Sequence, residues 1–170
     1  AVVGKTGLHY LETSAKGFRL CREGVVLAEH EWMVAPAVRA DSDVVGWAGR
    51  YAGRWKVYVD GLAHGDYDDV KVIDLARDGS FAAAVTKGGA WYAVTAKAEY
   101  GPLGRVSTVS AGPDGRVAWV AHSETGLVVG VDGASEVVVS AGAVRFCDDG
   151  ALAYPIARKE NVWTLVHPTG

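Results

Sequence analysis

Histidine side chains are the first candidates for chemistry in this chain, and their spacing matches no known catalytic or metal-binding motif. The five are His9, His30, His64, His122 and His167. No Gly-x-Ser-x-Gly elbow, zinc-protease motif, glycine-rich nucleotide fingerprint or cysteine signature accompanies them. We therefore expect no metal, no cofactor and no catalytic residue defined by a motif. A hydrolase that assembles its catalytic residues from separate loops stays open as an alternative.

Cysteines and carboxylates give no clearer signal for a metal site. Cys21 and Cys147 are the only cysteines, too few and too far apart in sequence for a disulfide framework or a zinc site. Residues 62–69, LAHGDYDD, carry three carboxylates that could coordinate calcium through oxygen. The spacing of an EF-hand loop and its distal Glu are absent, so we interpret this segment as a solvated loop.

A set of mostly basic residues could instead bind a partner. All of them stand in one kind of turn, between two runs of alternating apolar residues: Lys16, Arg50, Tyr51, Arg54, Lys87, His122, Arg158 and Lys159. The turns at the other ends of these runs are rich in aspartate. Turns collect charged residues in any protein, so a solvated edge without a partner is the alternative interpretation. If the turns share one face, their combined charge would attract an anionic partner, with Tyr51 as an apolar anchor.

These turns recur because the sequence is a repeat. The run before each turn begins at Leu8, Val45, Phe81, Val117 and Leu152. The run after each turn begins at Phe18, Trp55, Trp91, Leu127 and Trp163. Both series advance by about 36 residues, and alternation between turn signals such as Asp114-Gly115 predicts short antiparallel strands.

Large and small residues also recur at fixed positions. The third residue of the earlier run is mostly aromatic: Tyr10, Trp47, Ala83, Trp119 and Tyr154. The residue before it, on the opposite face, is small in most units: Gly46, Ala82, Ala118 and Ala153. We expect these residues, and the aromatic residues Phe18, Trp55, Trp91 and Trp163, to pack between stacked sheets rather than to bind a ligand.

The stretch from Pro113-Asp114-Gly115 to Asp132-Gly133 carries a family resemblance. Its Asp-Gly turn, strand, second turn and strand ending in Val-Asp-Gly resemble the WD40-like repeat of the TolB type. The resemblance covers all five units and implies an all-β fold, a compact five-bladed β-propeller with repeats of about 36 residues. We predict a single domain, residues 1–170, with units at 8–43, 44–79, 80–115, 116–150, and 151–170 plus 1–7.

The two ends of the array predict how the ring is completed. Residues 1–7, AVVGKTG, look like a strand that precedes the first unit, while the last unit lacks one strand. Pairing the N-terminal strand with the last blade would close the ring and leave no exposed sheet edge. We therefore expect a closed monomer. The alternative is an open fragment of a larger propeller, whose free edges would favour an oligomer.

Composition limits the function further. The net charge is −3 and no basic tract is present, which argues against a nucleic-acid partner. Apolar runs are far shorter than the roughly 20 residues that cross a bilayer. We expect a non-catalytic binding scaffold for a protein or other anionic partner, with a lectin-like propeller and a hydrolase as alternatives. The compartment stays open between the cytoplasm, slightly favoured, and a secreted or periplasmic location after signal removal.

Overall fold

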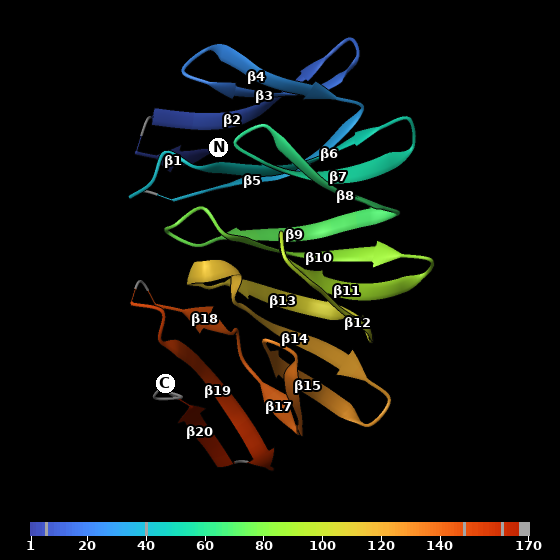
Figure 1. The fold of residues 1–170 in the computed structure, drawn as a ribbon, viewed down its shortest axis with the longest axis vertical. Helices are drawn as coiled ribbons and strands as arrows, with labels where there is room; N and C mark the ends of the chain where they lie inside the picture. The colour runs from blue at the N-terminus through green and yellow to red at the C-terminus, as the bar shows by residue number, and fades with distance from the viewer. Residues whose placement is uncertain (6, 40, 148, 161, 167–170) are drawn as a thin grey trace.

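The computed structural model describes residues 1–170 except 6, 40, 148, 161 and 167–170, and most of its described part is β-strand. Four-stranded antiparallel sheets follow one another along the chain, five in all (Figure 1). We number them sheet 1 to sheet 5. Sheet 1 holds β1 (Val2–Gly4), β2 (Gly7–Ser14), β3 (Gly17–Arg22) and β4 (Val25–His30). Sheet 2 holds β5 (Trp32–Val38), β6 (Val45–Tyr51), β7 (Arg54–Val59) and β8 (Leu62–Tyr67). The interpretation of residues 62–69 as a solvated loop is therefore wrong, because most of this segment is strand β8.

The next three sheets repeat this pattern. Sheet 3 holds β9 (Asp69–Leu75), β10 (Phe81–Lys87), β11 (Ala90–Val94) and β12 (Glu99–Leu103). Sheet 4 holds β13 (Val106–Ala111), β14 (Val117–Ser123), β15 (Gly126–Val131) and β16 (Ala134–Val138), with a short 3-10 turn, η1 (Pro113–Gly115), between its first two strands. Sheet 5 holds β17 (Ser140–Ala141), β18 (Arg145–Phe146), β19 (Leu152–Lys159) and β20 (Val162–Val166). The all-β prediction is confirmed.

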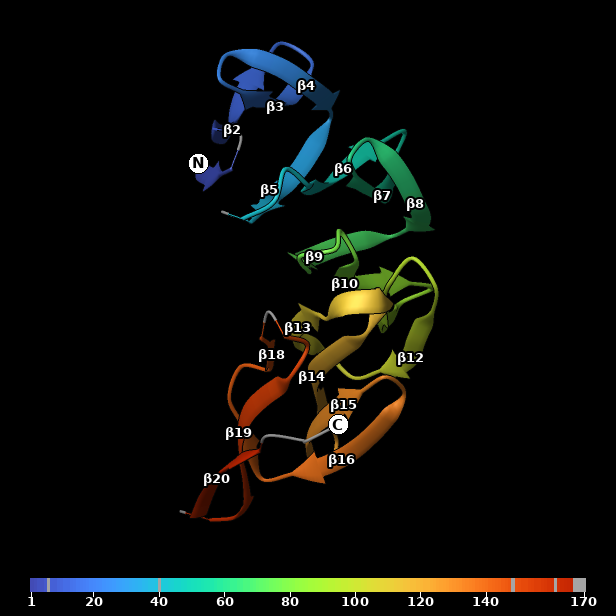
Figure 2. The ribbon, with the colours of Figure 1, turned by 60° about the vertical axis from the view of Figure 1, so that its left-hand side comes forward.

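The N-terminal strand does not close a ring. β1 pairs with β2, with Val2 opposite His9 and Val3 opposite Leu8, and so forms the first strand of sheet 1. No ladder joins β1 to β20 in the described part of the chain, and sheets 1 and 5 lie at opposite ends of the stack in both views (Figures 1 and 2). The prediction that residues 1–7 belong to the last sheet is therefore wrong. A short connection to β2 also costs less loop-closure entropy than a pairing across the whole array.

The same offset applies to every repeat. Each predicted unit begins with the second strand of a sheet, whereas the sheet itself begins one strand earlier. In sheet 2, for example, β5 precedes the predicted unit and pairs with β6, with Ala37 opposite Gly46. In sheet 5 this first strand is split into β17 and β18, which lie along the same side of β19. β20 pairs with the other side of β19, and no further strand pairs with β20 among the described residues.

Apolar clusters fill the space between successive sheets. Trp47, Trp119 and Tyr154 each pack against the preceding sheet and are at most 7% exposed. The small residues that alternate with them face the following sheet: Gly46 lies against Leu75, and Ala118 packs in the cluster between sheets 4 and 5. The expected packing of large against small residues is confirmed, because opposite faces of one strand serve two different sheets.

The aromatic residues near the start of the third strands also pack between successive sheets, with one exception. Trp55 and Trp91 pack on the clusters between sheets 2 and 3 and between sheets 3 and 4. The Phe18 ring packs at a tilt against Trp32 of sheet 2, with ring centroids 5.2 Å apart. Trp163 is 57% exposed, contrary to our expectation of burial. It lies on the face of sheet 5 that points away from sheet 4.

Hydrogen bonds between equivalent positions of neighbouring sheets complement the apolar packing. Asp74 of β9 accepts from the Ser110 hydroxyl at 3.1 Å and from the backbone N–H of Ala111 at 2.9 Å. The Ser110 hydroxyl in turn accepts from the N–H of Phe146 at 3.1 Å. One polar chain thus joins the first strands of sheets 3, 4 and 5 and fixes their relative position.

Candidate functional site

The turns between the second and third strands of the sheets lie along one edge of the stack, on the right of Figure 1 for sheets 1 to 4. All eight residues proposed for partner binding stand in or beside these turns. We call this edge the rim. Equivalent turns that are far apart in sequence therefore share one edge of sheets 1 to 4, although the environments of the individual residues differ.

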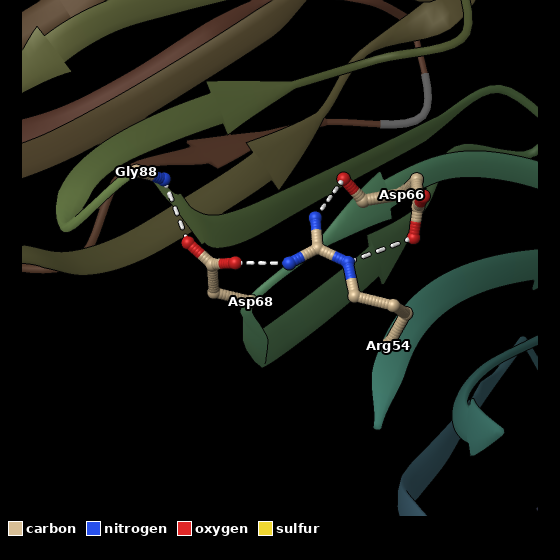
Figure 3. Close-up of polar contacts among 4 residues, drawn as sticks. All are labelled: Arg54, Asp66, Asp68 and Gly88. Atoms are coloured by element: carbon tan, nitrogen blue, oxygen red, sulfur yellow. Dashed lines mark hydrogen bonds and ion pairs between the residues drawn. The ribbon is translucent and has the colours of Figure 1, made fainter. Parts of the chain in front are cut away.

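Arg54 is held in place by carboxylates (Figure 3). Its Nε donates to Asp66 Oδ1 at 3.1 Å, and its Nη1 binds Asp68. Asp68 also accepts from the backbone N–H of Gly88 in the β10–β11 turn at 2.6 Å. The Arg54 guanidinium, followed by the Gly88 N–H, lowers the pKa of Asp68. Arg54 therefore links the rim turns of sheets 2 and 3 and is not a free cation.

Two further cations of the rim are paired as well. Lys87 Nζ lies 3.0 Å from Glu99 of β12, and Arg158 Nη2 lies 3.0 Å from Glu136 of β16. These carboxylates come from the fourth strands of their sheets, outside the turns that sequence reasoning compared. The rim is accordingly less basic than its turns alone suggest.

The remaining predicted residues show three environments. Lys16 and Lys159 are exposed. Tyr51 is 73% exposed, which suits the anchoring role expected of it. Arg50 is half-buried, and its Nε is enclosed without a hydrogen-bond partner. His122 is exposed and lines a groove with residues that sequence reasoning missed.

This groove lies between sheets 3 and 4, at the rim, and has a volume of about 520 Å³. Its polar and aromatic lining comes from five residues: Lys71, Trp91, Arg105, Ser107 and His122. Arg105 directly precedes β13, and its carbonyl accepts from the backbone N–H of His122 at 2.8 Å, which places the two side chains at the same end of their strands. We call this feature the rim groove.

Charge in the rim groove is one-sided. No carboxylate belongs to its described lining, although Lys71 forms an ion pair with Asp69 nearby. The Ser107 hydroxyl donates to the carbonyl of Val120 at 3.1 Å, so it is already engaged. Arg105 and His122 are therefore the groups best placed to meet a ligand, beside the half-buried indole of Trp91. Arg105 was missed because it precedes a first strand, a position outside the turns that we compared.

A second, smaller hollow between sheets 1 and 2 has mixed charge. It measures about 260 Å³ and is lined by Glu29, His30, Tyr51, Arg54, Lys56 and Tyr58. Burial lowers the pKa of His30, and the Trp47 indole N–H donates to its Nε2 at 3.4 Å. Both observations favour a neutral imidazole that serves packing between the sheets.

Metal ligands and thiols are the remaining candidates for chemistry. The described residues contain no group of three or more His, Cys, Asp or Glu that could hold a metal ion. Both cysteines are free, Cys21 buried and Cys147 exposed. His167 lies outside the described residues. No helix in the described part of the chain is long and apolar enough to cross a membrane.

Comparison with known proteins supports the architecture. No family model matches the sequence, and no curated protein matches it. Among solved structures, TolB from Acinetobacter baumannii superposes with a TM-score of 0.54 over 95% of this chain and 53% of its own length, at 11% sequence identity. The fold is of the β-propeller type. The chain thus spans about half the length of the structure that it resembles, and the likeness concerns the fold alone.

Proposed function

We propose that this chain is a non-catalytic binding scaffold whose five sheets act as the blades of an open propeller arc. Its partner is a protein that presents an acidic segment to the rim groove between sheets 3 and 4. The observation that carries the proposal is the groove itself, where Arg105, His122 and Trp91 converge without a carboxylate in the described lining.

The chemistry of this lining suits a carboxylate with an apolar neighbour. A guanidinium offers planar, paired donors that match a carboxylate, and an exposed ion pair elsewhere on the surface contributes little. A groove partly excludes water, so the same charges interact more strongly there than on a flat surface. Trp91 provides an apolar wall, and tryptophan and arginine are the residue types that most often dominate protein interfaces.

The rest of the rim contributes at longer range. Carboxylates neutralise three of the eight predicted residues, Arg54, Lys87 and Arg158. These three cations are therefore not available to pair with a partner. Lys16 and Lys159 remain exposed and add to the attraction of an acidic partner during its approach. Such steering affects the association rate and weakens with salt.

Binding of an acidic peptide tests this proposal. The probe is a fluorescein-labelled peptide of six glutamates interrupted by one leucine, and the readout is fluorescence anisotropy with the full chain. Arg105→Glu should weaken binding by about tenfold or more, because a charge-assisted hydrogen bond is lost and a repulsive charge is introduced.

The matched control is Arg77→Glu, which makes the same charge change at an exposed arginine of the opposite edge, between β9 and β10. This variant should bind the peptide within about twofold of the unmodified chain, since overall charge acts weakly at this distance. Equal weakening by both variants would show a nonspecific effect of net charge. Full binding by the Arg105→Glu variant would exclude the rim groove.

A further inference from the structure

The two outermost sheet faces of the array each carry exposed apolar side chains. Sheet 1 has one face against sheet 2 and one facing away from it, and sheet 5 has one face against sheet 4 and one facing away from it. We call the free face of sheet 1 the leading face and the free face of sheet 5 the trailing face. They lie at opposite ends of the stack (Figure 2).

The trailing face presents Trp163 and Leu165 of β20. These residues stand opposite Ala157 and Pro155 of β19, whereas the alternate residues Tyr154 and Ile156 pack toward sheet 4. Successive side chains of a strand point to opposite faces, so Trp163 and Leu165 point away from the array. They are 57% and 60% exposed.

Trp163 occupies a position that is buried elsewhere in the chain. Its repeat equivalents are Trp55 and Trp91, and each packs on the cluster that its sheet forms with the following sheet. The trailing face therefore has the aromatic half of a sheet-to-sheet interface, and no sheet of the described residues packs on it.

The leading face has the complementary half. Leu11 and Leu20 pack toward sheet 2, so Tyr10, which alternates with Leu11 on β2, belongs to the free face. Val3 and Val26, on β1 and β4, stand at that face and are 70% and 49% exposed. The repeat equivalents of Tyr10 are the buried residues Trp47, Ala83, Trp119 and Tyr154, which all contact a preceding sheet.

We propose that a second copy of this chain docks head to tail, with the trailing face of one copy on the leading face of the other. The chain itself makes this type of contact between each pair of successive sheets, so the two free faces are halves of an interface that its own sequence already encodes. Several large apolar side chains exposed on one face of a sheet are typical of an interaction site. The contact is heterologous, so it adds copies in one direction, into a ring or a longer stack.

Mass measurements with single-face variants test the proposal. Light scattering after size exclusion should give the unmodified chain an average mass above the 17.9 kDa of one copy, rising with concentration. The trailing-face variant is Trp163→Glu with Leu165→Glu, and the leading-face variant is Val3→Glu with Val26→Glu. Each alone should be a monomer, because every head-to-tail contact would then bury two introduced charges.

Mixing the two variants separates head-to-tail docking from other association. Each variant retains one intact face, so an equimolar mixture should form a complex of two chains and grow no further. Leu62→Glu, at an equally exposed leucine of β8, is the control and should associate like the unmodified chain. Circular dichroism verifies that each variant keeps its β-structure.

Three results would overturn the proposal. One is a monomeric unmodified chain at all concentrations, which would mean that the faces do not recognise each other. Another is continued self-association of either single-face variant. The third is a mixture that stays monomeric although both variants are folded.

Discussion

Gly130 is the position where a single added methyl group should most clearly test the packing between sheets. It stands on β15 directly opposite Trp119 of β14, and the indole lies across it. A Cβ at Gly130 would come within 2.1 Å of two atoms of the Trp119 ring. Movement of the indole is restricted, because Tyr100 of sheet 3 stacks on it with ring centroids 5.1 Å apart.

The expected cost of Gly130→Ala follows from two opposing effects. Overpacking of a buried site typically destabilises a protein by about 1–3 kcal/mol. Replacing glycine with alanine reduces the freedom of the unfolded chain, which offsets about 0.4–1 kcal/mol. We therefore expect a net loss of about 1–2 kcal/mol in the free energy of unfolding. For a chain of this size that corresponds to a decrease in Tm of roughly 2–8 °C.

Gly46→Ala is the matched control. Gly46 is also a buried strand glycine, yet a Cβ there would meet only the flexible end of Leu75 at 3.1 Å. Its equivalents in three other units are alanines, Ala82, Ala118 and Ala153. We expect the stability of this variant to stay within about 0.5 kcal/mol of the unmodified chain.

Urea denaturation followed by tryptophan fluorescence and by circular dichroism measures both variants. Adding Trp119→Leu to Gly130→Ala should remove most of the additional cost of the alanine, since the clash disappears with the indole. Equal stability of Gly130→Ala and Gly46→Ala would refute the packing argument. So would a cost of Gly130→Ala that is unchanged in the Trp119→Leu background.

Three further predictions concern polar groups. Asp74→Ala should destabilise the chain by about 1–3 kcal/mol in urea denaturation, because it leaves the Ser110 hydroxyl and a backbone N–H without their acceptor. Asp68 has a pKa lowered in the folded state by Arg54, so its contribution to stability is present above the ordinary Asp pKa and is lost as the pH falls below about 4. Asp68→Asn should therefore reduce the pH dependence of the free energy of unfolding below about pH 4. Burial lowers the pKa of His30, so the unfolded state takes up protons first and stability should decrease as the pH falls below about 6.5, an effect that His30→Gln should reduce.

Each of these predictions has a contrary result. An Asp74→Ala variant as stable as the unmodified chain would show that the polar chain between the first strands does not hold the sheets together. If the free energy of unfolding falls with acid equally in the unmodified chain and in Asp68→Asn, the coupling of Asp68 to Arg54 is contradicted. Stability that is constant between pH 7 and pH 5 in urea titrations would contradict a buried neutral His30.

Much of the fold could be predicted from the sequence because it depends on local patterns. Alternation sets the strands, Asp-Gly and similar pairs set the turns, and a fixed interval of about 36 residues sets the number of sheets. The large residue at Trp47 and the small residue at Gly46 indicate which faces pack, since neighbouring side chains of a strand point to opposite faces. These signals lie within a few residues of each other and need no knowledge of the tertiary structure.

Three features could not be predicted from the sequence, because they depend on contacts between residues that are far apart in it. β1 pairs with its neighbour in sequence, so the end faces stay open and Trp163 is exposed, which no local pattern distinguishes from the buried Trp55 and Trp91. Arg54 looks like a free cation in its turn, but carboxylates from outside that turn neutralise it. Arg105 meets His122 and Trp91 only where two sheets pack together. The repeat therefore determined what each sheet is made of, whereas the contacts between sheets, which depend on side chains far apart in sequence, decided which charges and apolar faces remain available to a partner.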